Sequence, residues 1–314
     1  MISRRNIRVK VMQTLYTTTT LETELKPGEP QKILLKHFEE TSGLFFYLTY
    51  FLIETARYAE TDSSLRAGKH LPSYEDLHVN TKIAGNEILK KIEQDVALKA
   101  QFKKYKPEQT IDKELLRKIY GQLATKPEYI KYTGKKDRDK KEEKEILEFI
   151  LNDMLLANEI FLSHIEENFS NWDDDGEMII QLLVAALQKP GGSNFNEMIS
   201  TEKLDFSKSL LKTVMEKKEH LQSLIIPKLK NWDPERIAIL DMILMEMGVA
   251  EFLYFETIPP KVTINEYIDL AKEYSTQQSG QFVNGILDNI HKDLVRDNQM
   301  HKVAFSPNAA QKPS

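Results

Sequence analysis

Helical spacing of apolar residues runs through most of the chain, and it limits the possible folds more than any other feature. The stretch Glu235 to Phe255 is apolar nearly all round, which predicts a helix at the centre of a bundle. No stretch shows the alternation of apolar and polar residues that a half-buried strand requires. The sequence therefore predicts an all-α protein, and its 314 residues are enough for two lobes.

Proline, glycine and polar clusters divide this pattern into separate helices. Asp233 and Pro234 are expected to cap and open the central helix, and Thr263 with Glu266 forms a predicted capping box for the next one. Apolar spacing predicts that Phe282 and Val283 belong to the core. Further helices are expected at residues 4–18, 33–60, 82–104, 112–124, 145–168, 178–187, 206–229 and 282–294.

Three polar segments are expected to interrupt the helices. The mixed-charge run "TGKKDRDKKEEK", residues 133–144, reads as a solvated loop at a domain boundary. The stretch "NWDDDGE", residues 171–177, is expected to stop one helix and to cap the next rather than to bind calcium, because it lacks the ligand spacing of a calcium loop. From Asp297 onward the tail is polar, and we expect it to be disordered.

Composition excludes several classes of protein. The chain has no cysteine, which removes disulfides and thiolate chemistry and fits a reducing cytoplasm. Its most apolar run, Gly43 to Ala56, is shorter than a bilayer span and contains Glu54, so we expect a buried helix and no membrane segment. The net charge of −5 argues against a protein that coats nucleic acid indiscriminately.

The sequence gives no positive sign of catalysis. No P-loop is present, no two histidines have the spacing of a helical metal site, and no serine, histidine and aspartate form a recognisable triad. We therefore expect no enzyme activity, no metal and no cofactor.

The N-terminal segment "SRRNIRVKVMQTLY" is unusual, because it places Arg4, Arg5 and Arg8 in the first turns of a predicted helix and adds Lys10. Cations are disfavoured at the positive end of the helix dipole. On the residues alone, two readings stay open: the terminus is simply solvated, or the arginines form a cationic strip that awaits an anion such as phosphate.

The segment "IPPKVTINEYIDLAKEYSTQQSGQFVNGILD", residues 258–288, resembles the C-terminal signature of the NusB family of bacterial transcription antitermination factors. It is preceded by "NWDPERIAILD", with Trp232, Arg236 and Asp241, and the opening "RRNIRVKVMQTLY" is similar to the family's arginine-rich first helix. Met242 and Glu246 stand where many members have arginines. The resemblance covers residues 3–20 and 205–295.

The resemblance implies a NusB-like helical bundle with an additional inserted helical lobe. The expected parts are a first helix at 1–25, a helical insertion at 26–200, a C-terminal bundle at 201–296 and a disordered tail at 297–314. It also implies a non-catalytic protein that binds the boxA element of ribosomal RNA leader transcripts. The implied partners are NusE, a ribosomal small-subunit protein, and the RNA polymerase antitermination complex, and a homodimer stays open.

Carried over by position, the resemblance implies that Arg4, Arg5, Arg8, Lys10 and Lys261 contact RNA. It places Tyr16 and Asp241 on a surface for RNA or a partner protein, and Gly285 where close helix packing is expected.

Two alternatives remain beside RNA binding. In a helical protein-interaction scaffold, the insertion would bind other proteins and the arginines would have no role in binding. An RNA methyltransferase with a NusB-like domain is nearly excluded, because no nucleotide-binding unit is present. The insertion could extend the RNA surface, contact polymerase or cover a dimer face.

Overall fold

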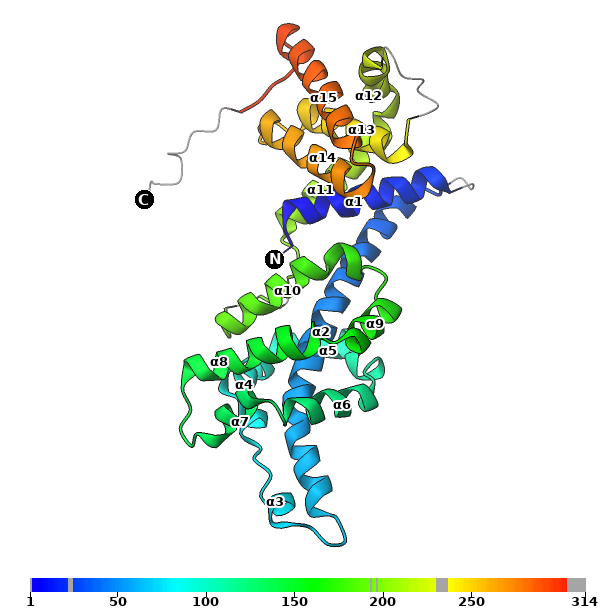
Figure 1. Cartoon of the computed structure of the whole chain (residues 1–314). Coiled ribbons are helices and arrows are strands. Elements are labelled where there is room, and N and C mark those ends of the chain that lie inside the picture. The colour runs from blue at the N-terminus through cyan, green and yellow to red at the C-terminus, as the bar shows by residue number, and fades with distance from the viewer. Residues whose placement is uncertain (1, 22–24, 193, 196, 230–236, 304–314) are drawn as a thin grey trace. The chain divides into compact units, whose positions relative to one another are not determined.

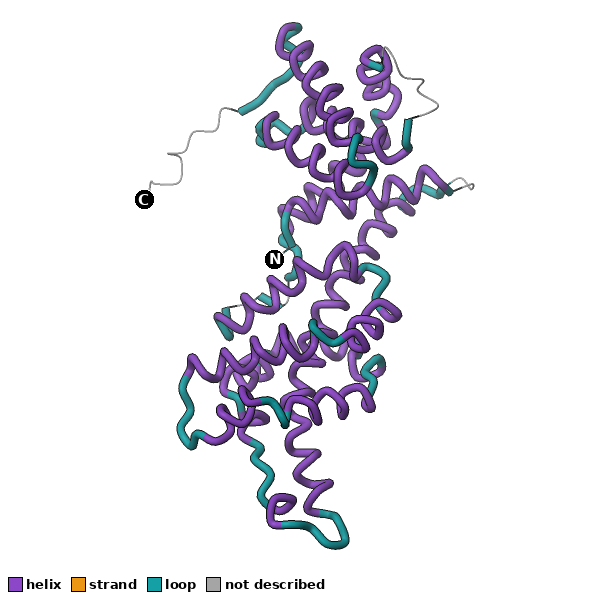
Figure 2. The backbone as a smooth tube through the Cα atoms, in the orientation of Figure 1, coloured by secondary structure: helices purple, strands orange, loops and turns teal. Residues whose placement is uncertain are grey.

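The computed structural model describes residues 2–21, 25–192, 194–195, 197–229 and 237–303, and all of them are helix or loop, without a strand (Figure 2). The predicted all-α fold is therefore confirmed. The chain forms two compact units. Unit 1 contains residues 38–198, and unit 2 contains residues 2–37 together with residues from 199 onward. The predicted boundaries of the insertion, at residues 26 and 200, differ from these unit limits, and the division into a core and an insertion stays a prediction.

Unit 2 joins both ends of the sequence in one bundle. Contacts among its helices bring α1 against α11 and α13, and α13 against α14 and α15. Its elements are α1 (Arg4–Thr20), the first turns of α2 (Glu29–Ala67), α11 (Thr201–Glu216), α12 (Lys218–Ile225), η4 (Ile226–Lys228), α13 (Ile239–Tyr254), α14 (Pro260–Tyr274) and α15 (Ser279–Arg296) (Figure 1).

Helix α13 is the centre of unit 2, as its apolar sequence predicts. All ten residues from Ile243 to Phe252 are buried. The helix begins at Ile239 with Ala238 as its N-cap, so the predicted start at Glu235 is wrong for residues 237–238. The proposed cap residues at 233 and 234, and also Trp232 and Arg236, lie outside the described residues.

A glycine does allow close helix packing in unit 2, but it is not Gly285. Gly285 is exposed, and a Cβ there would meet nothing within 4 Å. A Cβ on Gly248 of α13 would lie 2.9 Å from Cδ2 of Leu287 on α15. The close approach of α13 and α15 therefore depends on Gly248. Of the two predicted core residues of α15, Val283 is buried and Phe282 is half-buried.

The tail after α15 packs on the end of α13. Lys302 donates hydrogen bonds to the backbone oxygens of Glu251 and Phe255, both at 2.7 Å, and the Val303 amide donates to the oxygen of Glu256. The oxygens of Glu251 and Phe255 also accept from the amides of Phe255 and Ile258, so Lys302 adds a second donor to carbonyls at the end of α13. Disorder from Asp297 onward is thus wrong for residues 297–303, and the rest of the tail lies outside the described residues.

Unit 1 is built on the long helix α2, whose residues from Phe38 onward belong to this unit. Its core is rich in aromatic residues, such as Phe51 and Phe161, whose ring centroids lie 4.7 Å apart. The other elements are α3 (Tyr74–Leu77), η1 (Lys82–Gly85), α4 (Glu87–Gln94), α5 (Val96–Tyr105), η2 (Pro107–Gln109), α6 (Lys113–Leu123), α7 (Pro127–Gly134), α8 (Lys140–Phe149), the π-helical η3 (Ile150–Leu155), α9 (Glu159–Asn168) and α10 (Trp172–Gln188) (Figure 1).

Several helices of unit 1 break where local capping overrides apolar spacing. The predicted helix 82–104 is divided because Asp95 accepts hydrogen bonds from the amides of Ala97 and Leu98 and so caps α5. Helix α9 ends at Asn168 and Asn171 is the N-cap position of α10, as predicted for the stretch 171–177. The predicted helix start at residue 178 is wrong, because α10 already begins at Trp172, and Asp173 to Asp175 occupy its first turn, where the helix dipole favours carboxylates.

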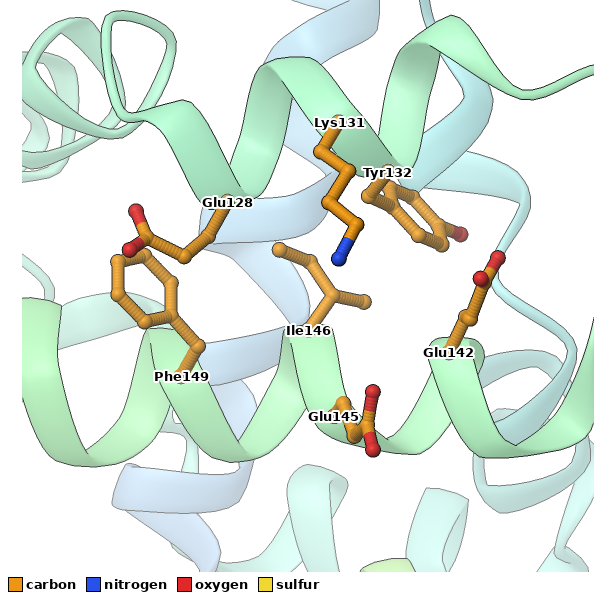
Figure 3. Close-up of a pocket in the computed structure, with 7 residues that line it drawn as sticks. All are labelled: Glu128, Lys131, Tyr132, Glu142, Glu145, Ile146 and Phe149. Atoms are coloured by element: carbon orange, nitrogen blue, oxygen red, sulfur yellow. The ribbon is translucent and has the colours of Figure 1, made fainter.

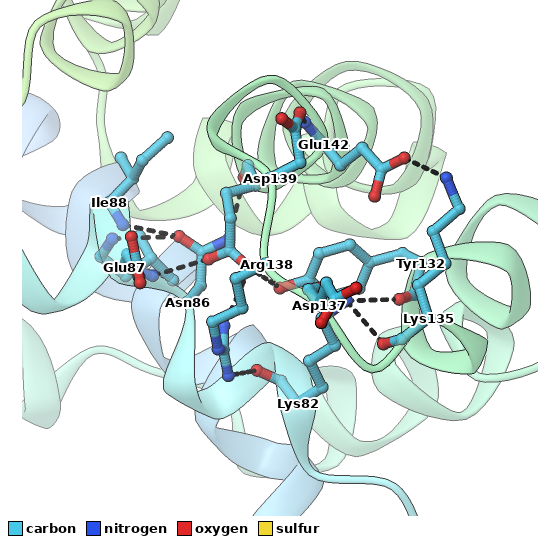
Figure 4. Close-up of polar contacts among 12 residues, drawn as sticks. Lys82, Asn86, Glu87, Ile88, Tyr132, Lys135, Asp137, Arg138, Asp139 and Glu142 are labelled. Carbon is cyan, nitrogen blue, oxygen red and sulfur yellow. Dashed lines mark hydrogen bonds and ion pairs between the residues drawn. The ribbon is translucent and has the colours of Figure 1, made fainter.

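The mixed-charge run 133–144 lies inside unit 1 and is not a domain boundary. The ammonium of Lys82 donates to the backbone oxygens of Tyr132, Lys135 and Asp137, each at 2.9 Å (Figure 4). Arg138 pairs at 2.8 Å with the buried carboxylate of Glu143. These bonds hold the run against η1, so its charges are largely satisfied within the fold.

In the part of the chain that the structure describes, none of the helices is long and apolar enough to cross a membrane.

Candidate nucleic-acid interface

Helix α1 is enclosed by unit 2 rather than lying at its rim. Ser3 caps the helix by accepting a hydrogen bond from the Asn6 amide at 3.2 Å. The six consecutive residues from Ile7 to Met12 are each at most 2% exposed. Consecutive burial covers every face of a helix, so the reading of the arginines as an exposed cationic strip is wrong for this part of α1.

Arg8 is the centre of a buried ion pair and is not available to RNA in this structure. Its Nε lies 2.7 Å from Oε1 of Glu251, and its Nη2 lies 3.1 Å from Oε2. The Arg8 side chain is 2% exposed and that of Glu251 is 0% exposed. Such two-point pairing is the strongest geometry between arginine and a carboxylate. The prediction that Arg8 contacts RNA is therefore corrected.

Helix α14 completes the environment of this pair. Thr263 Oγ1 and Tyr267 OH donate to the Glu251 carboxylate at 2.9 and 2.8 Å, and Glu266 accepts from Arg8 Nη1 at 3.3 Å. Burial alone would lower the pKa of Arg8, but the charges of Glu251 and Glu266 outweigh burial and raise it. The predicted capping box of Thr263 and Glu266 is wrong, because α14 begins at Pro260 and both side chains connect helices instead.

Arg4 and Arg5 remain on the surface, each paired with one carboxylate of unit 2. Arg4 lies 2.6 Å from Glu202 at the start of α11, and Arg5 lies 2.5 Å from Glu273 near the end of α14. The arginine side chains are 45% and 36% exposed. Exposed pairs of this kind contribute about 0–1 kcal/mol, so a phosphate can compete for the arginines at small cost.

The two predicted lysines have opposite environments. Lys10 is buried in the middle of α1, where its ammonium cannot reach a phosphate, so its assignment to RNA is corrected. Lys261 is exposed in the first turn of α14. Three predicted cations, Arg4, Arg5 and Lys261, are thus still accessible on unit 2.

Of the two predicted surface residues, only Tyr16 lies on the surface. Tyr16 is 45% exposed near the end of α1. Asp241 is buried and accepts a hydrogen bond from Ser279 Oγ at 2.8 Å, which ties the first turn of α13 to that of α15. Asp241 therefore has a structural role, and its prediction as a partner contact is corrected.

A groove of about 570 Å³ lies beside the end of α1 in unit 2. The buried carboxyl of Glu246 lines it, accepts a hydrogen bond from Gln222 at 2.8 Å and has a pKa that burial raises. The other lining residues are mostly apolar: Leu15, Thr18, Thr19, Leu21, Leu25, Val214, Met215, Lys218 and Ile243.

Unit 1 contains a smaller pocket of about 150 Å³ between α7 and α8. Figure 3 shows Lys131 reaching from α7 toward Ile146 and Glu145 on α8. Glu128, Tyr132, Glu142 and Phe149 complete its lining. No predicted site residue lies in this pocket. Among the described residues, no group of three or more histidine, aspartate or glutamate side chains is placed to hold a metal ion.

The structure thus defines an all-helical protein whose arginine-bearing first helix is anchored in a bundle built from both ends of the sequence. Residues 161–292 match the NusB family, so this part of the chain is similar to that family. The match begins in α9, 40 residues before the predicted C-terminal bundle, and does not include α1. The likeness of α1 to the family's first helix therefore still rests on its sequence.

Curated relatives with the name transcription antitermination protein NusB match about a third of the chain or slightly less. The protein of Methylacidiphilum infernorum is 47% identical over 86 residues, which are 27% of this chain and 60% of the relative. Those of Chloroherpeton thalassium and Salinibacter ruber are each 40% identical over 98 residues, 31% of this chain, and cover 46% and 61% of their own lengths. The chain thus spans about half to three fifths of these relatives, and no solved structure matches it.

Sequence reasoning missed Glu251 as the partner of Arg8. A signal was present, because Arg8 stands between Ile7 and Val9 in α1 and Glu251 stands within the apolar run of α13. Isolated opposite charges on the core faces of two helices indicate a buried pair. Their separation of 243 positions in the sequence gave no means of connecting the two.

Proposed function

We propose that this chain is a transcription antitermination factor that binds boxA-type leader RNA together with NusE, without enzymatic activity. The match of residues 161–292 to the NusB family carries this proposal, and the names of the curated relatives support the role in antitermination. Arg4, Arg5 and Lys261 are the residues that we propose for contact with RNA phosphates. Tyr16 is proposed for the partner surface.

The exposed ion pairs of α1 support this choice of residues. Glu202 and Glu273 hold the arginines in place at the surface without burying them. Arginine matches phosphate through its planar fork and stacks on bases, and single-stranded RNA offers both. The antitermination complex on RNA polymerase is the proposed setting of this binding.

A titration of boxA RNA with and without NusE tests the proposal. Three neutralised phosphates should give a plot of log affinity against log salt with a slope of about −2, at about −0.7 per contact on a single strand. The variant Arg4→Ala with Arg5→Ala should bind more weakly and with a shallower slope.

The control is Lys292→Ala, an exposed α15 lysine whose local ion pair with Asp288 makes it a comparable surface cation. It should leave the affinity unchanged. Absence of boxA binding, or a slope near zero, would reject RNA as the ligand. Partners that co-purify through nuclease and high salt would then favour the interaction scaffold.

A further inference from the structure

Charge in unit 1 is sorted along the sequence, although the whole chain has a net charge of only −5. Residues 82–144 contain 18 Lys and Arg against 11 Asp and Glu. Residues 145–197 contain one lysine against 11 Asp and Glu. Such asymmetry indicates a surface for a charged partner, provided that the charges are not already neutralised in the fold.

Six of the 18 Lys and Arg side chains in residues 82–144 form ion pairs with carboxylates. The ion pairs are Lys104 with Glu39, Arg117 with Glu114, Lys135 with Glu142, Arg138 with Glu143, Lys141 with Glu145 and Lys144 with Glu148. These cations therefore contribute little to an uncompensated surface.

Helix α5 and its C-cap bring together three lysines that are not among these ion pairs. Lys99 and Lys103 stand at positions i and i+4 on one face of the helix, and Lys106 follows as its C-cap in a left-handed backbone conformation. All three are exposed. We name these three residues the α5 stripe. The helix itself contains no carboxylate, and the side chain of its N-cap, Asp95, is engaged by two backbone amides.

Nearby carboxylates do not neutralise the α5 stripe. Among the described residues, no ion pair joins Lys103 or Lys106 to an acidic side chain. Lys99 acts electrostatically on Glu93, but Glu93 already pairs with Arg57 at 2.5 Å. Three ammonium groups about one helical turn apart thus share a surface without their own counterions.

We propose that the α5 stripe binds the phosphate backbone of single-stranded RNA, as a second contact surface in addition to that of unit 2. This inference rests on the proposed function, because it assigns a further surface to the same RNA. The stripe binds without regard to base sequence, since ammonium groups act on phosphates as point charges.

The α5 stripe is rich in positive charge and poor in exposed apolar side chains, which favours RNA over an acidic protein as its partner. Protein interfaces depend on a buried apolar or aromatic centre with few charged residues. On α5 the large exposed apolar side chain is that of Val96, and Phe102 and Tyr105 pack against the core of unit 1. A row of lysines without such anchors fits counterion release from a polyanion.

The test uses the full chain and a single-stranded RNA of about 40 nucleotides that contains boxA. The variant Lys99→Gln, Lys103→Gln, Lys106→Gln should weaken binding by roughly tenfold at moderate salt and make the slope of log affinity against log salt shallower by about 2, for three lost contacts. The matched control is Lys113→Gln, Lys126→Gln, Lys136→Gln, which removes the same charge from exposed lysines elsewhere in unit 1. It should change affinity less than twofold.

The outcomes separate this inference from the proposed function. If Arg4→Ala with Arg5→Ala weakens binding but the α5 variant does not, the proposed function stands and the α5 surface is rejected. Equal losses in both lysine variants would also reject it, because only overall charge would then matter. An α5 variant that keeps RNA affinity but no longer binds poly-glutamate would assign the stripe to acidic proteins. Failure of the unaltered chain to bind the RNA would overturn both proposals.

All variants should fold as the unaltered chain does. Their far-ultraviolet circular dichroism and melting midpoint should therefore be the same.

Discussion

Helices α1 and α5 look alike in sequence but use their cations in different ways. Each contains several Lys or Arg and no carboxylate of its own. In unit 2, the anions that face α1 come from α11, α13 and α14, and those of α13 and α14 fix Arg8 in the core. In unit 1, the α5 stripe is exposed, and no ion pair to Lys103 or Lys106 is formed by the residues that the structure describes. The charge of a helix therefore says little about binding until its burial and its neighbours are known.

The largest expected effect comes from breaking the buried pair of α1. Glu251→Gln leaves Arg8 charged and buried without its carboxylate, which should lower the free energy of unfolding by about 3–5 kcal/mol. Denaturant unfolding of the full chain measures this loss.

A companion variant sharpens the result. Arg8→Met combined with Glu251→Leu removes both charges, and it should recover much of the lost stability, because it leaves no buried unpaired charge. If the double variant is as unstable as Glu251→Gln alone, the cost comes from lost packing and not from the unpaired cation.

A second, smaller effect concerns Lys302, a cation of unit 2 that faces carbonyl groups. Burial lowers its pKa to about 8, although the charges of Glu251 and Glu256 oppose the change. Between pH 8 and the ordinary lysine value of 10.5, the unfolded chain holds more protons than the folded one, so stability should rise with pH.

The expected rise is about 1 kcal/mol between pH 8 and pH 9, and Lys302→Met should remove it. Unfolding of both proteins across this range gives the comparison. Identical pH profiles for the two proteins would mean that Lys302 titrates as an ordinary surface lysine.

The smallest effect is expected for the surface pairs of Arg4 and Arg5. Glu202→Gln with Glu273→Gln should change the free energy of unfolding by less than about 1 kcal/mol, because both pairs are exposed. Affinity for boxA RNA should rise a few-fold, since phosphate no longer competes with these carboxylates. A loss of stability as large as that of Glu251→Gln would erase the distinction between the buried and exposed arginines.

Sequence alone predicted the helical fold because apolar spacing records which residues are buried. It predicted the central position of α13 and the start of α1 for this reason. It missed the break before α5, where the local hydrogen bonds of Asp95 decide the chain direction. It also chose Gly285 over Gly248, because only the packed structure shows which glycine meets Leu287.

The candidate site was predicted less well, for a related reason. Nothing in the basic segment distinguishes Arg4, Arg5 and Arg8 from one another. In the structure Arg4 is exposed, whereas Arg8, one helical turn later, is buried. The partner that decides the fate of Arg8 lies 243 residues away. The α5 stripe was also overlooked, since the sequence showed its lysines but not the lack of carboxylates around them.

Glu251 is held from both directions of the chain: Arg8 binds its carboxylate, and Lys302 binds its backbone oxygen. During synthesis, the first helix must therefore wait for most of the polypeptide to leave the ribosome before its core contacts exist. Unit 1, which is contiguous in sequence, can fold earlier. Until Glu251 has been synthesised, Arg8 remains a solvated cation. The positions of Arg8 and Glu251 in the sequence therefore set the order in which the two units fold.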